Sequence, residues 1–407
     1  MKYIKKIFLF FALFTAYIYT LAINVIPKNI ILFQDETLKL DTIFGISVGL
    51  NNNQASIFAS TKAGISETGR YSLNVNLFDV FKVKEITVDV IENTSVIPVG
   101  NLAGLKLYSN GVMVVGKTSV QGVDSQKHKP YENTGIEEGD VILKINGNVL
   151  HSTDDLIYYI NKCNGNEAVL SCVRDGQSFE TKITPIKTAS GCYKLGLWVR
   201  DSAAGIGTVT FYEPETKLFG ALGHGIIDID TEKLIDIQSG EFVTTKIINI
   251  IKGVCGQPGK IQGTVENQKT IGEIYSNTIF GVYGKLTDAE ALKIDKSNVY
   301  PVASRNDIEE GEAKILCALE NGNVKEYTIE IKKIYLNNST NNKSMLIKIN
   351  DEELLSKTGG IVQGMSGCPI LQNDKFIGAI TNVLVSDPTT GYAVFADMMI
   401  KELNMIK

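Results

Sequence analysis

The chain has 407 residues, among them 40 basic and 45 acidic side chains, and a formal net charge of −5. A chain of this length is too long for one compact core, so two or three domains are expected. Its lysines and arginines form no stripe interleaved with aromatic residues, and nucleic acid is therefore not an expected partner.

The N-terminus has the pattern of an export segment. Lys2, Lys5 and Lys6 precede an apolar or weakly polar run from Ile7 to Ile23. This run is slightly longer than a usual signal-peptide core and at the short limit for a membrane span, so residues 1–26 are predicted to be a signal peptide or a membrane anchor. In both cases the lysines stay inside and the rest of the chain lies beyond a membrane.

Residues 27–97 consist of short alternating or β-branched runs, such as Tyr71 to Glu92. This pattern is typical of strands. We expect a small β-rich module that holds the later domains away from the membrane.

The cysteines and histidines are too scattered to form a metal site. No metal or organic cofactor is expected. A chain of this length does not need disulfides for its core, so we expect free thiols. The residues concerned are Cys163, Cys172, Cys192, Cys255, Cys317, Cys368, His128, His151 and His224.

The stretch GIEEGDVILKINGNVL, from Gly135 to Leu150, reads as a turn, a strand and a second turn. A helix with one apolar face is predicted from Thr153 to Asn161, capped by Thr153 or Asp154. A strand from Ala168 to Arg174 and a hairpin at Asp175-Gly176 follow.

This succession resembles a PDZ domain and assigns residues 98–187 to it. Such a fold binds an extended peptide as an added strand at an exposed sheet edge. By this resemblance the groove lies between residues 100–107 and the helix, with Gly104, Leu105 and Leu107 as peptide-binding residues. A domain that only braces its neighbour is the alternative.

Residues 188–407 are rich in glycines that separate short β-prone runs, for example Leu195 to Val199 and Thr208 to Tyr212. Turn signals at this density predict barrels or sandwiches. These 220 residues are enough for two small antiparallel barrels packed together, the size of a trypsin-like protease.

Two short motifs in this region carry the chemistry. His224 stands among small residues that leave room for a general base, although a buried histidine without a catalytic role is the alternative. In Gly364 to Pro369 the glycines allow backbone amides to converge on one point. Ser366 is therefore the expected nucleophile, with the amides of Gly364 and Ser366 as the oxyanion hole. This G-x-S-G-x-P pattern resembles the nucleophile loop of trypsin-like serine proteases.

Cys368 is a second candidate nucleophile, but a thiolate would need its own partner to lower its pKa. We expect it to be a small buried side chain.

Four blocks in order resemble the stage IV sporulation protein B serine peptidases of endospore-forming bacteria: LGLWVRDSAAGIGTVTFYEP, ALGHGI, IKGVCGQPGKIQG and LLSKTGGIVQGMSGCPI. The resemblance implies a protease exported into the space between the two forespore membranes. It also implies cleavage of the protease itself and of a membrane-bound regulatory protein, which releases an intramembrane protease that processes a mother-cell sigma factor. By motif position it makes His224 the base, Ser366 the nucleophile and Asp351 the acid.

Asp351 has a second interpretation. It lies only 15 residues before Ser366, and Asn350-Asp351 followed by two glutamates is typical of a helix N-terminus. Asp228, Asp230 and Asp288 are rival acids.

For the whole chain the alternatives are an inactive PDZ scaffold at a membrane and a general quality-control protease. The KGVCGQPGK loop is expected to be a hairpin without an assigned role.

Overall fold

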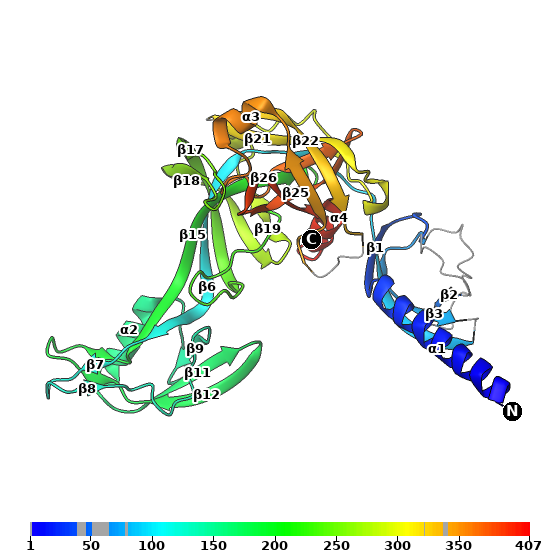
Figure 1. Ribbon diagram of the computed structural model, residues 1–407. Helices are drawn as coiled ribbons and strands as arrows, with labels where there is room; N and C mark the ends of the chain where they lie inside the picture. Colours follow the sequence, from blue (N-terminus) through cyan, green and yellow to red (C-terminus); the bar gives the residue numbers. More distant parts are fainter. Residues whose placement is uncertain (1, 39–45, 51–64, 78–79, 321, 337–340) are drawn as a thin grey trace.

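The computed structural model describes residues 2–38, 46–50, 65–77, 80–320, 322–336 and 341–407, and these are mainly β (Figure 1). The expected fold class, a PDZ domain with a double β-barrel behind an N-terminal helix, is confirmed. The two barrels lie together, the PDZ domain extends away from them, and the N-terminal module lies on another side.

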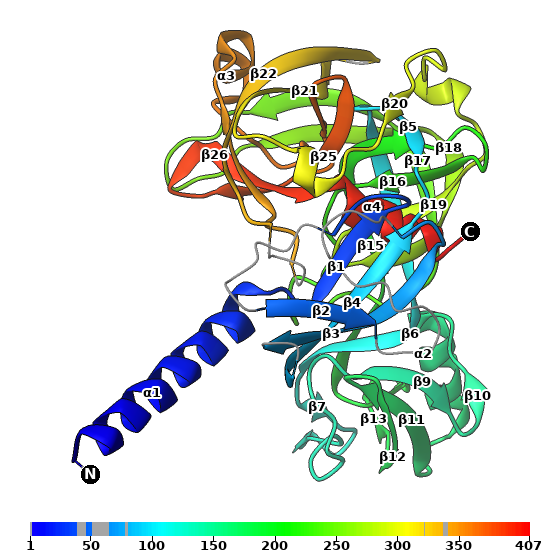
Figure 2. The same ribbon diagram turned by 90° about the vertical axis from the view of Figure 1, so that its right-hand side faces the viewer.

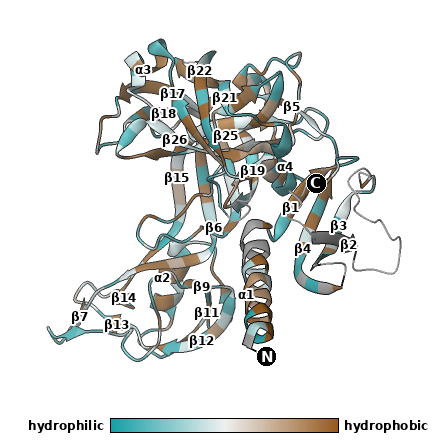
Figure 3. Ribbon diagram, turned by 45° about the vertical axis from the view of Figure 1, so that its right-hand side comes forward, coloured by the Kyte–Doolittle hydropathy of each residue, from teal (hydrophilic) through white to brown (hydrophobic). Residues whose placement is uncertain are grey.

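The N-terminal module is a helix followed by a four-stranded sheet. The helix α1 (Lys2–Val25) includes an exposed stretch, Tyr3–Thr20, that is long and apolar enough to cross a membrane (Figure 3). The sheet has the order β1-β4-β3-β2, with β1 parallel to β4 and the other pairs antiparallel. Its strands are β1 (Asn29–Phe33), β2 (Ile46–Leu50), β3 (Gly69–Leu77) and β4 (Phe81–Ile91).

Barrel one is a closed ring of six antiparallel strands in the order β6-β17-β18-β19-β16-β15, with β15 returning to β6. Large buried side chains such as Leu107, Phe219 and Phe242 fill it. The strands are β6 (Leu102–Lys117), β15 (Leu197–Tyr212), β16 (Leu218–Ala221), β17 (Ile237–Ile251), β18 (Lys260–Thr278) and β19 (Gly281–Leu286).

Two strands of barrel one continue into the PDZ domain. The ladder between β6 and β15 runs from Leu197 opposite Lys117 to Thr208 opposite Leu102, with two bulges. One end of each strand therefore belongs to barrel one and the other end to the PDZ sheet, as Figure 1 shows. The sequence predicted two short strands where the structure has the single strand β15.

The PDZ domain adds β9 and the hairpin β11–β12 beside β6. Asp175 and Gly176 both have left-handed backbone conformations, as a two-residue hairpin turn requires. The predicted helix cap is wrong: the hydroxyl of Ser152 accepts the amide of Asp155, whose carboxylate accepts the amide of Ser152. The elements are β7 (Val120–Gln121), β8 (Lys127–His128), β9 (Val141–Ile145), β10 (Asn148–Val149), α2 (Thr153–Lys162), β11 (Ala168–Arg174), β12 (Gln177–Ile183), β13 (Ile186–Lys187) and β14 (Tyr193–Lys194).

The predicted peptide-binding residues lie in barrel one. Gly104, Leu105 and Leu107 pair with β15 on one side and with β17 on the other, so they offer no open sheet edge. Both leucines are buried in the barrel core. The prediction differs from the structure because the first half of β6 lies between β15 and β17 of barrel one, and only its second half pairs with the PDZ strand β9.

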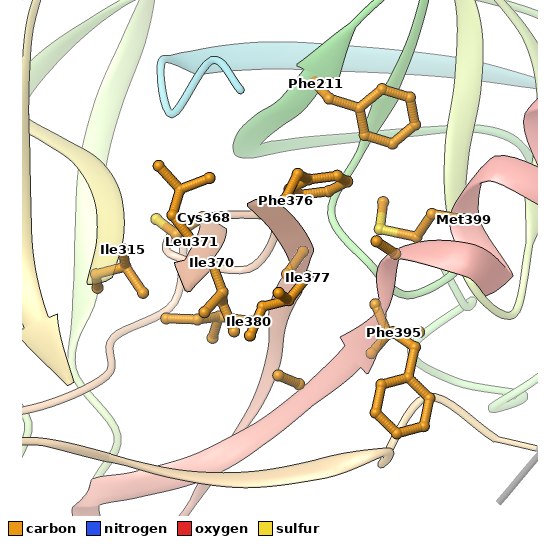
Figure 4. Packing of buried hydrophobic residues seen from close by; sticks show 14 of the residues in the cluster. Phe211, Ile315, Cys368, Ile370, Leu371, Phe376, Ile377, Ile380, Phe395 and Met399 are labelled. Atoms are coloured by element: carbon orange, nitrogen blue, oxygen red, sulfur yellow. The ribbon is translucent and has the colours of Figure 1, made fainter. Parts of the chain in front are cut away.

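Barrel two is a closed ring in the order β21-β22-β23-β26-β25-β24. Its core is shown in Figure 4, where Phe376 also packs on Phe211 of barrel one, with ring centroids 5.5 Å apart. The elements are β21 (Gly311–Glu320), β22 (Asn323–Ile334), β23 (Met345–Ile349), α3 (Glu352–Thr358), β24 (Pro369–Gln372), β25 (Lys375–Leu384), β26 (Asp387–Phe395) and α4 (Ala396–Asn404).

Short segments complete the fold around the barrels: β5 (Ser95–Pro98), β20 (Tyr300–Pro301) and the 3₁₀ turns η1 (Glu290–Leu292) and η2 (Arg305–Asp307). The N-terminal sheet lies against α4, the last helix (Figure 2). There Asp89 of β4 forms ion pairs with Lys401 of α4 and with Arg70 of β3.

Candidate active site

A cavity of about 900 Å³ lies between the barrels, and both His224 and Ser366 line it. Most of its wall is apolar. Other lining residues come from β15, from the turn after β16, from the loop before β18, from the segment before β24 and from β25. They include Ile206, Leu222, Ile226, Pro258, Ile361, Val362, Gly364, Thr381 and Val383.

His224 sits in a tight turn that follows β16. Leu222 and Gly223 in this turn both have left-handed conformations. A Cβ atom at Gly223 would lie 3.1 Å from side-chain atoms of Thr381 and Val394, so glycine lets the turn approach barrel two closely. The turn thereby carries His224 to the junction of the barrels.

The environment of His224 defines its protonation. Its Nδ1 lies 2.8 Å from the carbonyl oxygen of Gly225. Because a carbonyl only accepts, Nδ1 must carry the hydrogen, which leaves the lone pair of Nε2 free to take a proton. Burial lowers the pKa of His224 below its usual value, and the hydrogen bond to Gly225 opposes this only partly. The imidazole is therefore neutral near pH 7.

Ser366 lies in the loop that enters β24, held by Gly364 and Gly367, which both have positive φ angles. Its hydroxyl donates to the carbonyl of Thr381 over 2.8 Å. Within the described residues, the amides of Gly364 and Ser366 donate to no acceptor, whereas the amide of Gly367 donates to Ile380. The loop thus presents two free donors beside a serine hydroxyl.

The structure brings the two loops together. The backbone of Gly223 packs against Ile380 and Thr381, and the carbonyl of Thr381 accepts the Ser366 hydroxyl. On the other side a Cβ at Gly367 would lie 2.5 Å from the nitrogen of Leu222. His224 and Ser366 therefore face one cavity from loops that touch on both sides.

Asp351 lies elsewhere, at the start of α3. Its carboxylate accepts the amide of Leu354 at 2.9 Å and that of Thr328 at 3.3 Å. It is the N-cap of α3 and is not among the described residues that line the cavity. In this structure Asp351 and His224 are not brought together.

The rival acids are also engaged away from the imidazole. Asp228 and Asp230 both pair with Arg200, and Asp288 pairs with Lys269. Across the described parts of the chain, the imidazole of His224 has no carboxylate partner. The carbonyl of Gly225 occupies the position at Nδ1 instead.

Cys368 is fully buried in the core of barrel two and is not among the described residues at the cavity (Figure 4). Its sulfur lies 3.7 Å from the hydroxyl of Thr208. The described histidines, cysteines and acidic residues form no group of three or more that could hold a metal ion.

Two backbone carbonyls at the site were not predicted from the sequence. The carbonyls of Gly225 and Thr381 hold the imidazole and the serine hydroxyl. Any residue type supplies such a carbonyl, so no sequence signal marks these positions.

Two closed six-stranded barrels, with a histidine from one and a serine from the other at a shared cavity, define a serine peptidase that also carries a PDZ domain. The chain belongs to the SpoIVB peptidase S55 family, whose sequence model matches residues 191–400. A PDZ domain model matches residues 86–184. The expected family and the expected enzyme class are confirmed.

The chain is similar to several known proteins over parts of its length. It is 36% identical over 70 residues to a Clostridium perfringens protein named "Putative zinc metalloprotease CPE1693", and this match covers 17% of the chain and 21% of that relative. The chain thus spans about a fifth of the length of this curated relative.

Among solved structures, the inactive form of the Rv3671c protease matches with 13% identity over 49% of the chain and 84% of its own length, with a TM-score of 0.29. The active form of Rv3671c from M. tuberculosis matches with 15% identity, coverages of 41% and 74%, and a TM-score of 0.24. The PDZ domain of an SdrC-like protein from Listeria monocytogenes matches with 22% identity, coverages of 22% and 87%, and a TM-score of 0.18.

Proposed function

We propose that the chain is an exported serine endopeptidase in which Ser366 is the nucleophile and His224 the general base. The observation that carries this proposal is the pairing at one cavity of a serine hydroxyl with an imidazole whose Nε2 has no partner among the described residues. The apolar helix α1 supports export or membrane association.

The reaction follows from the groups present. The Ser366 hydroxyl leaves the carbonyl of Thr381, gives its proton to His224 Nε2 and attacks the peptide carbonyl carbon. The amides of Gly364 and Ser366 stabilise the oxyanion that forms. The imidazolium then protonates the leaving amine as the peptide C–N bond breaks. Water hydrolyses the acyl-enzyme by the same steps and regenerates the serine.

Asp351 is the acid that the family resemblance implies. For that role the start of α3 would have to move so that a carboxylate reaches His224 Nδ1, which the Gly225 carbonyl now occupies. We propose instead that Asp351 acts as the cap of α3, and that the Gly225 carbonyl sets the tautomer of the imidazole.

We infer that the peptide groove of the PDZ domain lies between β15 and α2. In the described chain, residues 197–205 of β15 pair with β6 on one side and have no strand partner on the other. The helix α2 lies beside this part of β15, and Asp201 accepts the amide of Thr153 at 2.7 Å. Leu197 and Val199 pack against the PDZ core and would form the floor of the groove.

We further propose the substrates that family membership supports: the chain itself and a membrane-associated regulatory protein. Cleavage of the regulator would lead to intramembrane processing of a mother-cell sigma factor precursor, in the space between the two forespore membranes. A general quality-control protease would instead cut many unfolded chains, and a scaffold would cut none.

Self-cleavage of the full chain in detergent, followed by intact mass, tests the enzymatic proposal. Fragments should form in the wild type and be absent in Ser366→Ala. Equal fragmentation of both proteins would remove Ser366 as the nucleophile.

A further inference from the structure

Thr208 lies on β15 where the two barrels meet, and its side chain is almost completely buried. Its hydroxyl donates to the carbonyl of Gly364 over 2.7 Å. Its amide donates to the carbonyl of Ser366 over 3.1 Å. One residue of barrel one therefore holds two carbonyls of the nucleophile loop in barrel two.

The same residue also contacts the loop of the general base. The carbonyl of Thr208 accepts the amide of Leu222 over 3.1 Å, two residues before His224. Gly367 packs on this contact, because a Cβ there would lie only 2.3 Å from the Thr208 carbonyl oxygen. Thr208 is thus bonded to both loops that form the proposed site.

The hydrogen bonds of Thr208 hold two peptide units of the nucleophile loop, and the unit that carries the Ser366 amide lies between them. In a planar trans peptide the N–H and the C=O point in opposite directions, so holding a carbonyl also directs the amide on the same unit. The unit that carries the Ser366 amide is held through Met365, whose carbonyl accepts the amide of Cys368 over 2.9 Å. The units on either side of it, beginning at Gly364 and at Ser366, are the two that Thr208 holds.

Glycine at position 364 makes this restraint necessary. Glycine rotates about its backbone bonds more freely than other residues. Without the hydroxyl of Thr208, the peptide unit between Gly364 and Met365 loses the hydrogen bond to its carbonyl. Among the described residues it then keeps one hydrogen bond, from the Met365 amide to the carbonyl of Val362 over 3.0 Å. Rotation of this unit would turn the Gly364 carbonyl toward the cavity and displace the neighbouring amide donors.

We propose that Thr208 is the positioning residue of the nucleophile loop: its hydroxyl and amide keep the carbonyls of Gly364 and Ser366 turned away from the cavity, so that the amides of these residues face the substrate. This inference rests on the proposed role of Ser366. It assigns to Thr208 an effect on the rate of acylation and none on substrate binding.

The chain supplies a matched control on the same strand. Thr210 is also fully buried, but its hydroxyl has no hydrogen-bond partner among the described residues. Thr208→Val and Thr210→Val each replace a buried hydroxyl by a methyl group of similar size. Only the first change removes a bond to the nucleophile loop, so the pair separates positioning from general packing.

The experiment measures kcat and KM of the full chain in detergent, with a fluorogenic peptide that spans a mapped self-cleavage site, together with thermal unfolding. We expect Thr208→Val to lower kcat at least tenfold with KM within twofold of wild type. Thr208→Ser, which keeps a donor, should stay within threefold of wild type, and Thr210→Val should be unchanged. If Thr208→Val does not fold, Thr208→Ala with Thr210→Ala as its match decides the same question.

Equal kcat in Thr208→Val and Thr210→Val would overturn the inference, as would a rise in KM without a fall in kcat. Failure of the proposed function looks different, because Ser366→Ala would then keep the activity. An inactive Ser366→Ala variant together with a fully active Thr208→Val variant refutes the positioning role alone.

Discussion

At His224, one backbone contact and burial together suit the imidazole to its proposed role as a base. The hydrogen bond to Gly225 leaves the proton on Nδ1, and burial lowers the pKa of the imidazole. Both effects leave Nε2 able to accept a proton at neutral pH.

The lowered pKa predicts the acid limb of the pH–rate profile. A histidine in a model peptide has a pKa of about 6.5. Because burial disfavours the imidazolium, His224 stays neutral to a lower pH, and the midpoint of the limb in kcat/KM should fall below about 6.5. Peptide turnover measured between pH 4.5 and 8 checks this, and a midpoint clearly above that value would contradict it.

Asp351 can be tested by a substitution that separates its two roles. Asparagine caps helices about as well as aspartate, whereas alanine costs about 1 kcal/mol. If Asp351 is the cap of α3, Asp351→Asn should keep activity within about threefold and Asp351→Ala should lower stability by about that amount. A triad acid behaves differently, since its change to asparagine lowers kcat by about 10⁴ in a trypsin-like enzyme. Such a loss in Asp351→Asn with unchanged thermal stability would make Asp351 the acid.

At the scale of elements, β15 joins the PDZ domain to the catalytic barrels. Its first half forms an edge of the PDZ sheet, and its second half carries Thr208 between the barrels. Arg200, in the first half, pairs with Asp228 and Asp230 in the segment after His224. A peptide bound along β15 would therefore lie on the same strand that holds the nucleophile loop.

Peptide binding to the proposed groove can be followed by the fluorescence of the one tryptophan of the chain. Trp198 lies in the first half of β15 and is 64% exposed. A peptide added beside this strand should change its fluorescence. Overlapping peptides from the chain's own residues 27–97 form the panel, because the chain itself is a proposed substrate. Val199→Pro removes a backbone donor from the edge strand and should weaken the response. Unchanged emission with every peptide would argue against a groove at β15.

The sequence predicted local elements well and long-range pairing poorly. The strand Ala168 to Arg174 and the Asp175-Gly176 turn were predicted because alternation and turn chemistry are local. The pairing of Gly104 with both β15 and β17 was missed because its partners lie far along the chain. The cap at Ser152 was missed because neighbouring residues are equally good caps.

The candidate site was predictable only in part for the same reason. His224 and Ser366 stand in unusual glycine-rich surroundings, and the structure places both at one cavity. The partners of these side chains are backbone carbonyls, and Thr208 is one of many threonines. Their importance comes from position in three dimensions, which local sequence patterns do not record.

At the scale of the whole molecule, the modules are joined by different means. The PDZ domain shares two strands with barrel one. The N-terminal sheet instead lies against α4 (Figure 2), through an ion pair between Asp89 and Lys401 and through Ile31 and Phe33, which belong to the same buried cluster as α4 and barrel two. The two shared strands fix the distance between the proposed peptide groove and the cavity. The N-terminal sheet places α1 on another side of the molecule from the PDZ domain.

The most direct test of the central claim follows the full chain in detergent by intact mass over time, as wild type, Ser366→Ala and His224→Ala, each with and without a fluorophosphonate probe. The account predicts defined fragments and a probe adduct on Ser366 in the wild type, and neither in the two variants. Fragments that persist in Ser366→Ala, or an adduct on another residue, would contradict Ser366 as the nucleophile. A wild-type chain that is neither cut nor labelled would instead support an inactive scaffold.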